Sequence, residues 1–356
     1  MPIKRQPGKR PVTVERILIA GYGSIGRRHL RLARELLPGA DIRVLRHAEC
    51  DFVPEYADGC FFDLQSAVKF APQLVVVANP APFHMRVAIP LAEAGAHLLI
   101  EKPLADTVED VPHLIDLCKK KKRVLMTGYN LRFLPSLTRF RELVLSRKLI
   151  GRVLSVRCEI GQYLPSWRPD TDYREGVSAR KALGGGALLE LSHEIDYLRW
   201  IFGEIAWVKA SLLRQSDLDI DVEDTAHLTL GFAGADDDRE LVASVNMDFI
   251  RHDTTRTCVA IGAEGSLRWN GLTGEVEMFR RGGGGWETVF CYLHQRDESY
   301  FAEWHHLLGL IDMTVEPLLT GEDGLRALEV IDAIRQSSAS GCIERMANLA
   351  VKDTST

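Results

Sequence analysis

A lysine stands directly after a short apolar segment, in the triplet Glu101-Lys102-Pro103. The apolar segment, residues 97–100, predicts a strand that is covered on both faces, as in a parallel sheet. Lys102 then lies at the carboxyl end of that strand, where open α/β sheets bind their ligands. There its ammonium group can polarise a hydroxyl or carbonyl oxygen and stabilise developing negative charge. An exposed lysine at a strand end is the alternative interpretation.

A glycine-rich hexapeptide, Gly-Tyr-Gly-Ser-Ile-Gly at residues 21–26, forms a second cluster. It follows an apolar run at residues 16–20 and precedes a segment, residues 27–37, with apolar positions at helical spacing. In such a turn the glycines permit the bend, the approach of a pyrophosphate and close packing of helix on strand, while the helix N-terminus attracts phosphate charge. This context predicts a dinucleotide site rather than a plain strand–helix turn, and Glu101 can orient the chain or hold the ribose. The residues expected to contact the dinucleotide here are Gly21, Gly23, Ser24, Ile25 and Gly26.

The residues after the second predicted strand, residues 42–45, select the cofactor. Arg46 lies about twenty residues after Gly26, where an acidic residue would hold the ribose hydroxyls of NAD. Here His47 follows, and no carboxylate occurs before Glu49. A cation at this place can hold the 2′-phosphate of NADP, so we expect NADP, with NAD as the alternative. Stacking of Arg46 on the adenine of either cofactor is the competing interpretation.

A histidine in the second half of the chain lies in a segment, residues 187–202, with apolar positions at helical spacing. On one continuous helix, His193 shares the polar face with Glu190 one turn before it and Asp196 one turn after it. Two such carboxylates can orient an imidazole and tune its pKa for general acid or base catalysis on a substrate hydroxyl. A solvated helix face is the alternative. The three glycines at residues 184–186 permit close approach by a ligand or by another backbone.

The segment of residues 163–174 combines two prolines with aromatic and charged residues, which predicts an ordered loop. Trp167 and Tyr173 can stack on the apolar face of a sugar, and Arg168 can hold a carboxylate or phosphate. A loop that contacts a second subunit is an equally good interpretation. The expected substrate contacts are Tyr163, Trp167, Arg168, Tyr173, Glu190 and Asp196.

Two kinds of predicted element position these residues. Strands and helices alternate up to residue 127, which predicts a doubly wound α/β domain over residues 15–127. From residue 128 to 340 longer strands alternate apolar and polar residues, which predicts an α+β domain with a large, mostly antiparallel open sheet. The closing helices of this domain can pack back on the first one. Residues 1–14 and 341–356 are expected to be tails.

Length and composition narrow the function classes. A chain of 356 residues suits two domains. Its net charge of −5 gives no electrostatic reason to expect a nucleic acid. No run approaches the roughly 18 apolar residues that a membrane span needs. The seven cysteines are scattered, which is typical of reduced thiols in a cytoplasmic protein, and nothing in the sequence requires a metal.

Several motifs together resemble those of the Gfo/Idh/MocA oxidoreductases. The motifs are the turn Asn79-Pro80 followed by His84, the Gly-x-His strand and Glu-Lys-Pro triplet of residues 95–103, and the segments 128–135, 184–186, 261–265 and 324–329. The resemblance spans nearly the whole chain. It implies a Rossmann-type first domain, with Asn79, Pro80, His84, Glu101 and Lys102 at the cofactor, beside Arg46 and His47 from the end of the second strand. It also implies catalysis by Lys102 and His193, with a homodimer or homotetramer formed through the open sheet.

One position departs from the commonest pattern of that family. Its members often carry an aspartate four residues before the histidine, whereas this chain has Leu189 there and Glu190 one position later. The role of Glu190 is therefore open, while the spacing from His193 to Asp196 matches. The loop and helix pattern is also similar to that of members from bacterial surface-sugar or sialic-acid-like biosynthesis. The implied substrates are sugars, amino sugars, and nucleotide-linked or acidic sugar derivatives.

The sequence therefore predicts a dehydrogenase or reductase that passes a hydride between nicotinamide and a secondary alcohol or ketone of a sugar. Two alternatives share the fold. An enzyme of the glycosidase type would keep its NAD bound through oxidation, elimination and re-reduction. A redox-silent regulator would bind the dinucleotide only as a signal, and it would not need Lys102 and His193.

Overall fold

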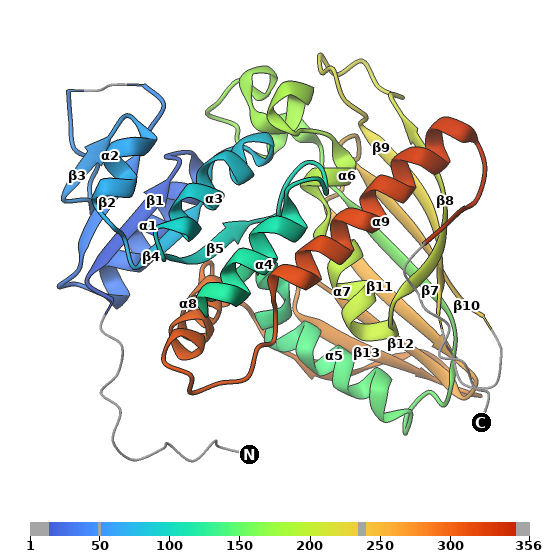
Figure 1. Ribbon diagram of the computed structural model, residues 1–356. Coiled ribbons are helices and arrows are strands. Elements are labelled where there is room, and N and C mark those ends of the chain that lie inside the picture. Colours follow the sequence, from blue (N-terminus) through green and yellow to red (C-terminus); the bar gives the residue numbers. More distant parts are fainter. Residues whose placement is uncertain (1–13, 49–50, 234–239, 347–356) are drawn as a thin grey trace, which may run out of the picture. The chain divides into compact units, whose positions relative to one another are not determined.

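The computed structural model describes residues 14–48, 51–233 and 240–346 of the chain. It divides into two compact units (Figure 1). Unit 1 comprises Met1–Asn130 and Tyr300–Leu328, and unit 2 comprises Leu131–Ser299 and Glu329–Thr356. Apart from Val14, the predicted tail of residues 1–14 lies outside the described residues, as do Glu49 and residues 347–356.

Within the described residues, unit 1 holds a six-stranded parallel sheet in the order β3-β2-β1-β4-β5-β6. Its strands are β1 Arg16–Ala20, β2 Asp41–Leu45, β3 Gly59–Phe61, β4 Leu74–Val77, β5 His97–Glu101 and β6 Leu125–Gly128. Its helices are α1 Ser24–Leu36, α2 Leu64–Lys69, α3 His84–Glu93, α4 Val111–Lys121, most of α8 Glu298–Ile311 and the first residues of α9 Gly321–Ser340. This confirms the predicted doubly wound α/β fold.

Continuous apolar runs explain the centre of this sheet. Every residue of β4 and β5 is buried, because helices flank both faces (Figure 1). β3 and α2 were not predicted, since a strand of three residues and a helix of six show no clear periodicity. Asp63 begins α2 by accepting a hydrogen bond from the backbone N–H of Ser66 at 2.8 Å.

The described part of unit 2 contains a nine-stranded sheet in the order β14-β13-β12-β11-β7-β10-β9-β8-β15. Only β7 and β10 pair in parallel there, so the predicted mostly antiparallel sheet is confirmed. The strands are β7 Val153–Gly161, β8 Ile205–Leu213, β9 Thr225–Phe232, β10 Leu241–Asp248, β11 Thr255–Gly262, β12 Gly265–Asn270, β13 Glu275–Arg280, β14 Trp286–Cys291 and β15 Glu344–Arg345. β15 lies in the stretch that was expected to be a tail, and it pairs with β8.

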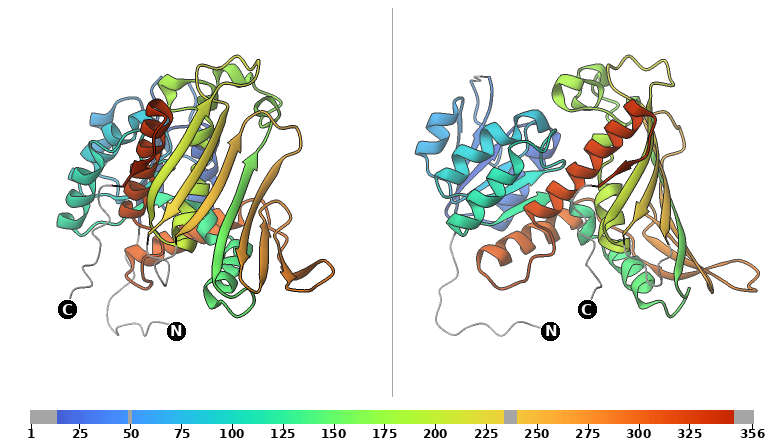
Figure 2. Two further views of the ribbon diagram at one scale, coloured as in Figure 1. Left: turned by 90° about the vertical axis from the view of Figure 1, so that its right-hand side faces the viewer. Right: turned by 45° about the vertical axis from the view of Figure 1, so that its right-hand side comes forward.

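One face of this sheet is covered and the other is open. Along β7 the buried residues Val156, Cys158 and Ile160 alternate with the more exposed Ser155, Arg157 and Glu159. The helices α5 Pro135–Ser146 and α6 Ala187–Glu190 pack on the covered face. The left view of Figure 2 looks onto the open face. Alternation of this kind is what a half-buried antiparallel sheet requires.

The helix predicted for residues 187–202 is wrong in one respect, because it is two helices. The first, α6, ends at Glu190, and α7 His193–Phe202 begins after a two-residue break. Around the break the N–H groups of Ser192 and Glu194 bond to carbonyl oxygens only three residues back, so the turn is tighter than an α-helix. Glu190 and His193 therefore do not share the face of one continuous helix.

No helix among the described residues is both long and apolar enough to cross a bilayer.

Candidate active site

The glycine turn joins β1 to α1 at the carboxyl edge of the unit 1 sheet. Gly21 has a φ of +105°, and a Cβ atom there would lie 2.6 Å from the backbone nitrogen of Asn79. A Cβ on Gly26 would overlap the carbonyl oxygen of Gly21. The first glycine is therefore needed for the turn and the third for the packing of α1 on that turn.

Gly23 differs from its two neighbours in the motif. A Cβ built on Gly23 meets nothing within 4 Å, so the backbone here faces open space. Ser24 and Ile25 follow as the first residues of α1, and the first helical turn carries no acidic side chain. Uncovered N–H groups at a helix N-terminus are what an anionic pyrophosphate needs.

The turn after β4 borders the same edge of the sheet. The Oδ1 atom of Asn79 is buried and has no hydrogen-bond partner among the described residues. The next residue, Pro80, begins a short 3₁₀ turn. The ring of His84 is buried, with Nε2 2.6 Å from the carbonyl oxygen of Asn79 and Nδ1 3.2 Å from that of Leu104. His84 thus ties this turn to the loop after Pro103, and burial lowers its pKa.

Lys102 lies at the carboxyl end of β5, half-buried, as predicted. Because β4 separates β1 from β5 in a parallel sheet, Lys102 and the glycine turn share one edge. Glu101 is 6% exposed, and its two oxygens have partners inside the protein. Oε2 accepts the Lys102 backbone N–H at 3.1 Å, and Oε1 lies 2.7 Å from Nε2 of His29. Of the two roles considered for Glu101, these contacts favour orientation of the chain.

Arg46 lies just beyond β2, between two aromatic rings. Its guanidinium carbon is 5.2 Å from the ring centre of Tyr22 and 5.2 Å from that of Phe52. His47, the next residue, is exposed. The two rings hold the guanidinium near the glycine turn, since Tyr22 is part of that turn.

His193 is the first residue of α7 and is half-buried. The two acids that follow in the first turn are fully buried, which contradicts the alternative of a solvated helix face. Glu194 forms an ion pair with Arg256 of β11 at 2.9 Å. The carboxylate of Asp196 receives two hydrogen bonds from Arg132, from Nε at 3.0 Å and from Nη2 at 2.7 Å.

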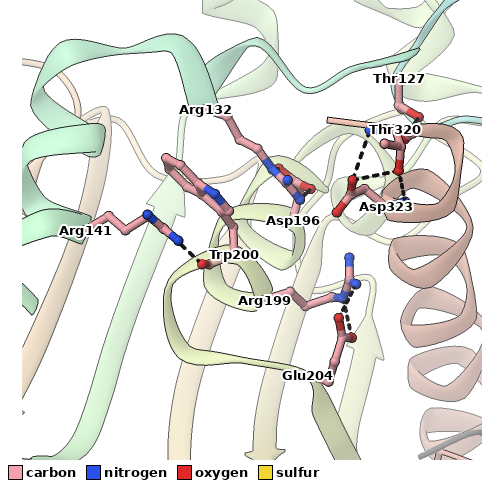
Figure 3. Close-up of polar contacts among 9 residues, drawn as sticks. All are labelled: Thr127, Arg132, Arg141, Asp196, Arg199, Trp200, Glu204, Thr320 and Asp323. Carbon is pink, nitrogen blue, oxygen red and sulfur yellow. Dashed lines mark hydrogen bonds and ion pairs between the residues drawn. The ribbon is translucent and has the colours of Figure 1, made fainter. Parts of the chain in front are cut away.

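Figure 3 shows the guanidinium of Arg132 facing the Asp196 carboxylate beside the Trp200 ring. The side chains of Arg132 and Asp196 are only 3% and 2% exposed. Trp200 also packs against Arg141, whose Nε donates to the Trp200 carbonyl oxygen at 3.2 Å (Figure 3). These contacts fix α7, and with it the position of His193, within unit 2.

The aromatic side chains of the predicted substrate loop are engaged with residues of unit 2 outside the loop. The Trp167 ring packs edge-on to Phe249, and its indole N–H donates to Gln162. The Tyr163 ring lies 4.3 Å from the ring of His252. The Tyr173 hydroxyl accepts the Asp219 backbone N–H at 3.2 Å. In this loop Arg168 is exposed, and Glu190 at the end of α6 is half-buried.

The glycine run before α6 is explained by contacts inside unit 2. A Cβ on Gly185 would overlap the carbonyl oxygen of Val177, and one on Gly186 would overlap the Glu223 carboxylate. Glu223 in turn accepts the Leu188 backbone N–H at 3.0 Å. Of the two partners considered for this run, the approach of protein atoms is the one that the contacts show.

Comparison with known sequences divides the chain in a similar way. The pattern described as "Oxidoreductase family, NAD-binding Rossmann fold" matches residues 15–129. The pattern described as "GFO/IDH/MocA C-terminal domain" matches residues 138–268. Together the two segments exceed half of the chain. The chain belongs to the GFO/IDH/MocA family. The resemblance inferred from the motifs is confirmed.

Individual members of the family show how far the similarity extends. A levoglucosan dehydrogenase of Pseudarthrobacter phenanthrenivorans is 36% identical over 141 residues, which are 39% of this chain and 35% of that protein. A myo-inositol 2-dehydrogenase of Thermotoga maritima is 26% identical over 278 residues, 74% of this chain and 76% of that protein. For three such relatives, the aligned region spans 35%, 54% and 35% of the relative's length.

A solved structure supports the fold. The structure titled levoglucosan dehydrogenase in complex with NADH has a TM-score of 0.80 and 24% identity, and the match covers 93% of this chain and 99% of that one. At this identity the similarity establishes the fold of the GFO/IDH/MocA chain described here.

In this GFO/IDH/MocA protein the residues of unit 1 fit a dinucleotide. The open backbone at Gly23 and the orphaned Oδ1 of Asn79 lie at the edge that also carries Lys102. Two supporting residues were not predicted from the sequence: His29, which bonds to Glu101, and Arg132, which bonds to Asp196. His29 lies close to the glycine motif and Arg132 within the motif of residues 128–135, but their partners are 72 and 64 residues away in the chain. No local pattern reveals such pairs.

Proposed function

We propose that the protein is an NAD(P)-dependent dehydrogenase or reductase acting on a secondary alcohol or ketone of a sugar or sugar derivative. The observation that carries this proposal is the shared edge of the unit 1 sheet. The glycine turn after β1, the Asn79 turn after β4 and Lys102 after β5 end three neighbouring strands. In open parallel sheets this edge binds the ligand.

The substrate class follows from the relatives. One is named for its action on levoglucosan and another for its action on myo-inositol, both polyhydroxylated rings. A secondary hydroxyl on such a ring is the group that hydride transfer oxidises. We extend this chemical class, and no individual sugar, to this chain.

In the proposed chemistry, Lys102 and His193 manage the proton of the reacting hydroxyl group. When the cofactor is bound, its nicotinamide accepts or donates the hydride. The Lys102 ammonium binds the substrate oxygen and stabilises negative charge on it. His193 takes the proton of the hydroxyl, or returns it in the reverse direction. Arg132 and Arg256 support His193 by holding the two acids that follow it in α7.

The cofactor preference rests on Arg46. A guanidinium held by Tyr22 and Phe52 next to the glycine turn provides a cation for the 2′-phosphate of NADP. Arg46→Ala should then raise the KM for NADP by about tenfold and change that for NAD by less than about twofold. Equal losses for both cofactors would instead show that Arg46 stacks on adenine.

The open face of the unit 2 sheet is the proposed contact with a second copy, giving a dimer or tetramer. It carries both polar and apolar side chains, among them Leu213 of β8, which is 42% exposed. Light scattering of the purified protein at several concentrations tests this assembly. The cytoplasmic location expected from the scattered cysteines stays a prediction.

Turnover of a sugar panel with NAD or NADP tests the function directly. Net formation of reduced nicotinamide, followed by its near-ultraviolet absorbance, is expected with at least one polyhydroxylated ring. Product formation without net reduction would favour the enzyme that retains its NAD. Binding of dinucleotide without turnover of any sugar would favour the regulator.

Variants of the two proton-handling residues test the mechanism. Lys102→Ala and His193→Ala should each lower kcat/KM by about 10²-fold or more. Exposed residues of the same types, Lys121 on α4 and His305 on α8, provide the matched alanine controls. Full turnover in either active-site variant would remove that residue from the mechanism.

A further inference from the structure

Beneath Lys102, three buried side chains form a hydrogen-bonded chain inside unit 1. The indole N–H of Trp304 on α8 donates to Nδ1 of His29 on α1 at 2.9 Å. The other ring nitrogen of His29, Nε2, lies 2.7 Å from Oε1 of Glu101. Trp304 and His29 are fully buried, and Glu101 is nearly so. The chain therefore links α8 to the turn that carries Lys102.

The donors and acceptors of this chain determine where the protons lie. An indole N–H can only donate, so Nδ1 of His29 must be the unprotonated nitrogen. The single proton of the neutral ring is then on Nε2, and it is donated to Glu101. A proton on Nδ1 would face the Trp304 N–H and break that bond. Trp304 thus fixes His29 as the neutral Nε2–H tautomer.

Glu101 connects the oriented His29 ring to the backbone of Lys102. Its second oxygen accepts the Lys102 backbone N–H at 3.1 Å. Burial opposes its ionised form, but the His29 hydrogen bond and the nearby Lys102 outweigh it and lower the pKa of Glu101. Gly128 makes room for the carboxylate, because a Cβ there would lie 3.1 Å from Glu101 Oε2. The carboxylate is consequently held from two sides.

A second buried acid, next to Trp304 in the sequence, has a different protonation state from Glu101. Glu303, which precedes Trp304 on α8, is fully buried, and neither of its carboxyl oxygens has a hydrogen-bond partner among the described residues. Burial and the charge of Glu101 raise the pKa of Glu303 well above its usual range. Glu303 is thus neutral where Glu101 is ionised, and Glu101 keeps the single negative charge of the pair.

We propose that His29 and Trp304 are positioning residues for Lys102, acting through Glu101. This rests on the proposed function, because it assigns their purpose to the presentation of the Lys102 ammonium to substrate. On this proposal α8, some 200 residues after Lys102 in the chain, contributes to the site without lining it. Catalytic groups need such supporting contacts to keep their side chains in the productive geometry. Neither residue is required to touch cofactor or substrate.

Trp304→Phe tests the proposal, because it removes the indole N–H and keeps an aromatic ring. Nitrogen NMR should show His29 as one tautomer in the wild type and as a mixture in the variant. The amide proton of Lys102 should exchange faster in the variant. In turnover, kcat should fall about tenfold while the KM for the dinucleotide changes less than about twofold.

Trp269→Phe is the matched control. Trp269 is also fully buried, and its indole N–H donates to Ser136 at 3.0 Å, but it belongs to unit 2. It should lose comparable stability without changing the His29 tautomer or the exchange of the Lys102 amide. A Trp304→Phe variant whose kcat matches that of Trp269→Phe would overturn the proposal.

Two replacements of His29 test whether a hydrogen-bond donor to Glu101 is enough to restore activity. Glutamine keeps an N–H donor for Glu101, whereas leucine keeps none. His29→Gln should recover most of the kcat that His29→Leu loses, and equal losses in the two variants would contradict a role through Glu101. If no sugar is turned over by the wild type, the proposed function fails. The tautomer and the amide exchange would then still report whether Trp304 orders the Lys102 turn.

Discussion

The two units stabilise their proposed proton-handling residues by opposite means. In unit 1, a neutral chain from Trp304 through His29 reaches the one ionised group, Glu101. In unit 2, a doubly hydrogen-bonded ion pair between Arg132 and Asp196 is almost completely buried. The neutral hydrogen-bonded side chains of unit 1 select one tautomer of His29 and hold the turn at Lys102, and they require little desolvation of charge. A buried ion pair holds a helix strongly, but each charge depends on the other.

Removal of one partner from the ion pair should have the largest effect on stability. Arg132→Met leaves the Asp196 carboxylate buried without its main cation, and we expect a loss of about 3–5 kcal/mol in the free energy of unfolding. Urea denaturation measures it. The double variant Arg132→Met/Asp196→Leu removes both charges and should recover most of this loss. If the single variant is as stable as the double, the pair does not hold α7.

Breaking the neutral chain should have a smaller effect. His29→Leu leaves one oxygen of Glu101 without its donor, for which we expect a loss of about 1–3 kcal/mol. The same denaturation experiment applies, with His29→Gln as the control that keeps the donor. A loss as large as that of Arg132→Met would mean that the two units do not differ in the way described.

The neutral acid beside the chain predicts a dependence on pH. The raised pKa of Glu303 means that the folded protein keeps a proton which the unfolded chain loses above about pH 4.3. The free energy of unfolding therefore falls as the pH rises toward the folded-state pKa. Glu303→Gln removes this fall, so its stability advantage over the wild type should grow as the pH rises from about 5 to about 8. An advantage that is constant with pH would show that Glu303 is ionised in the folded protein.

An exposed ion pair gives the smallest expected effect and calibrates the others. Arg139 and Glu142 on α5 are 3.0 Å apart, with side chains 44% and 55% exposed. Arg139→Ala should change stability by less than about 0.5 kcal/mol, and added salt should abolish the difference. A larger change would indicate that Arg139 packs against the protein through its aliphatic part.

Within each unit, the sequence alone determined what depends on neighbouring residues. The three glycines predicted the turn, since only residues without a Cβ fit at Gly21 and Gly26. The apolar segment of residues 97–100 predicted β5, and with it the place of Lys102 at a strand end. The alternating strands predicted the half-open sheet of unit 2. Such patterns repeat over a few residues and need no partner to be recognised.

Tertiary structure alone decided which polar groups meet. Trp304 and His29 are 275 positions apart, and Asp196 meets Arg132 across 64. The break between α6 and α7 moved Glu190 off the face of His193, although helical periodicity favoured one continuous helix. Hydrogen bonds between distant residues depend on the packing of whole elements, and their donors carry no periodic signal. The lysine at the end of β5 was therefore predictable, whereas the side chains that hold it in place were not.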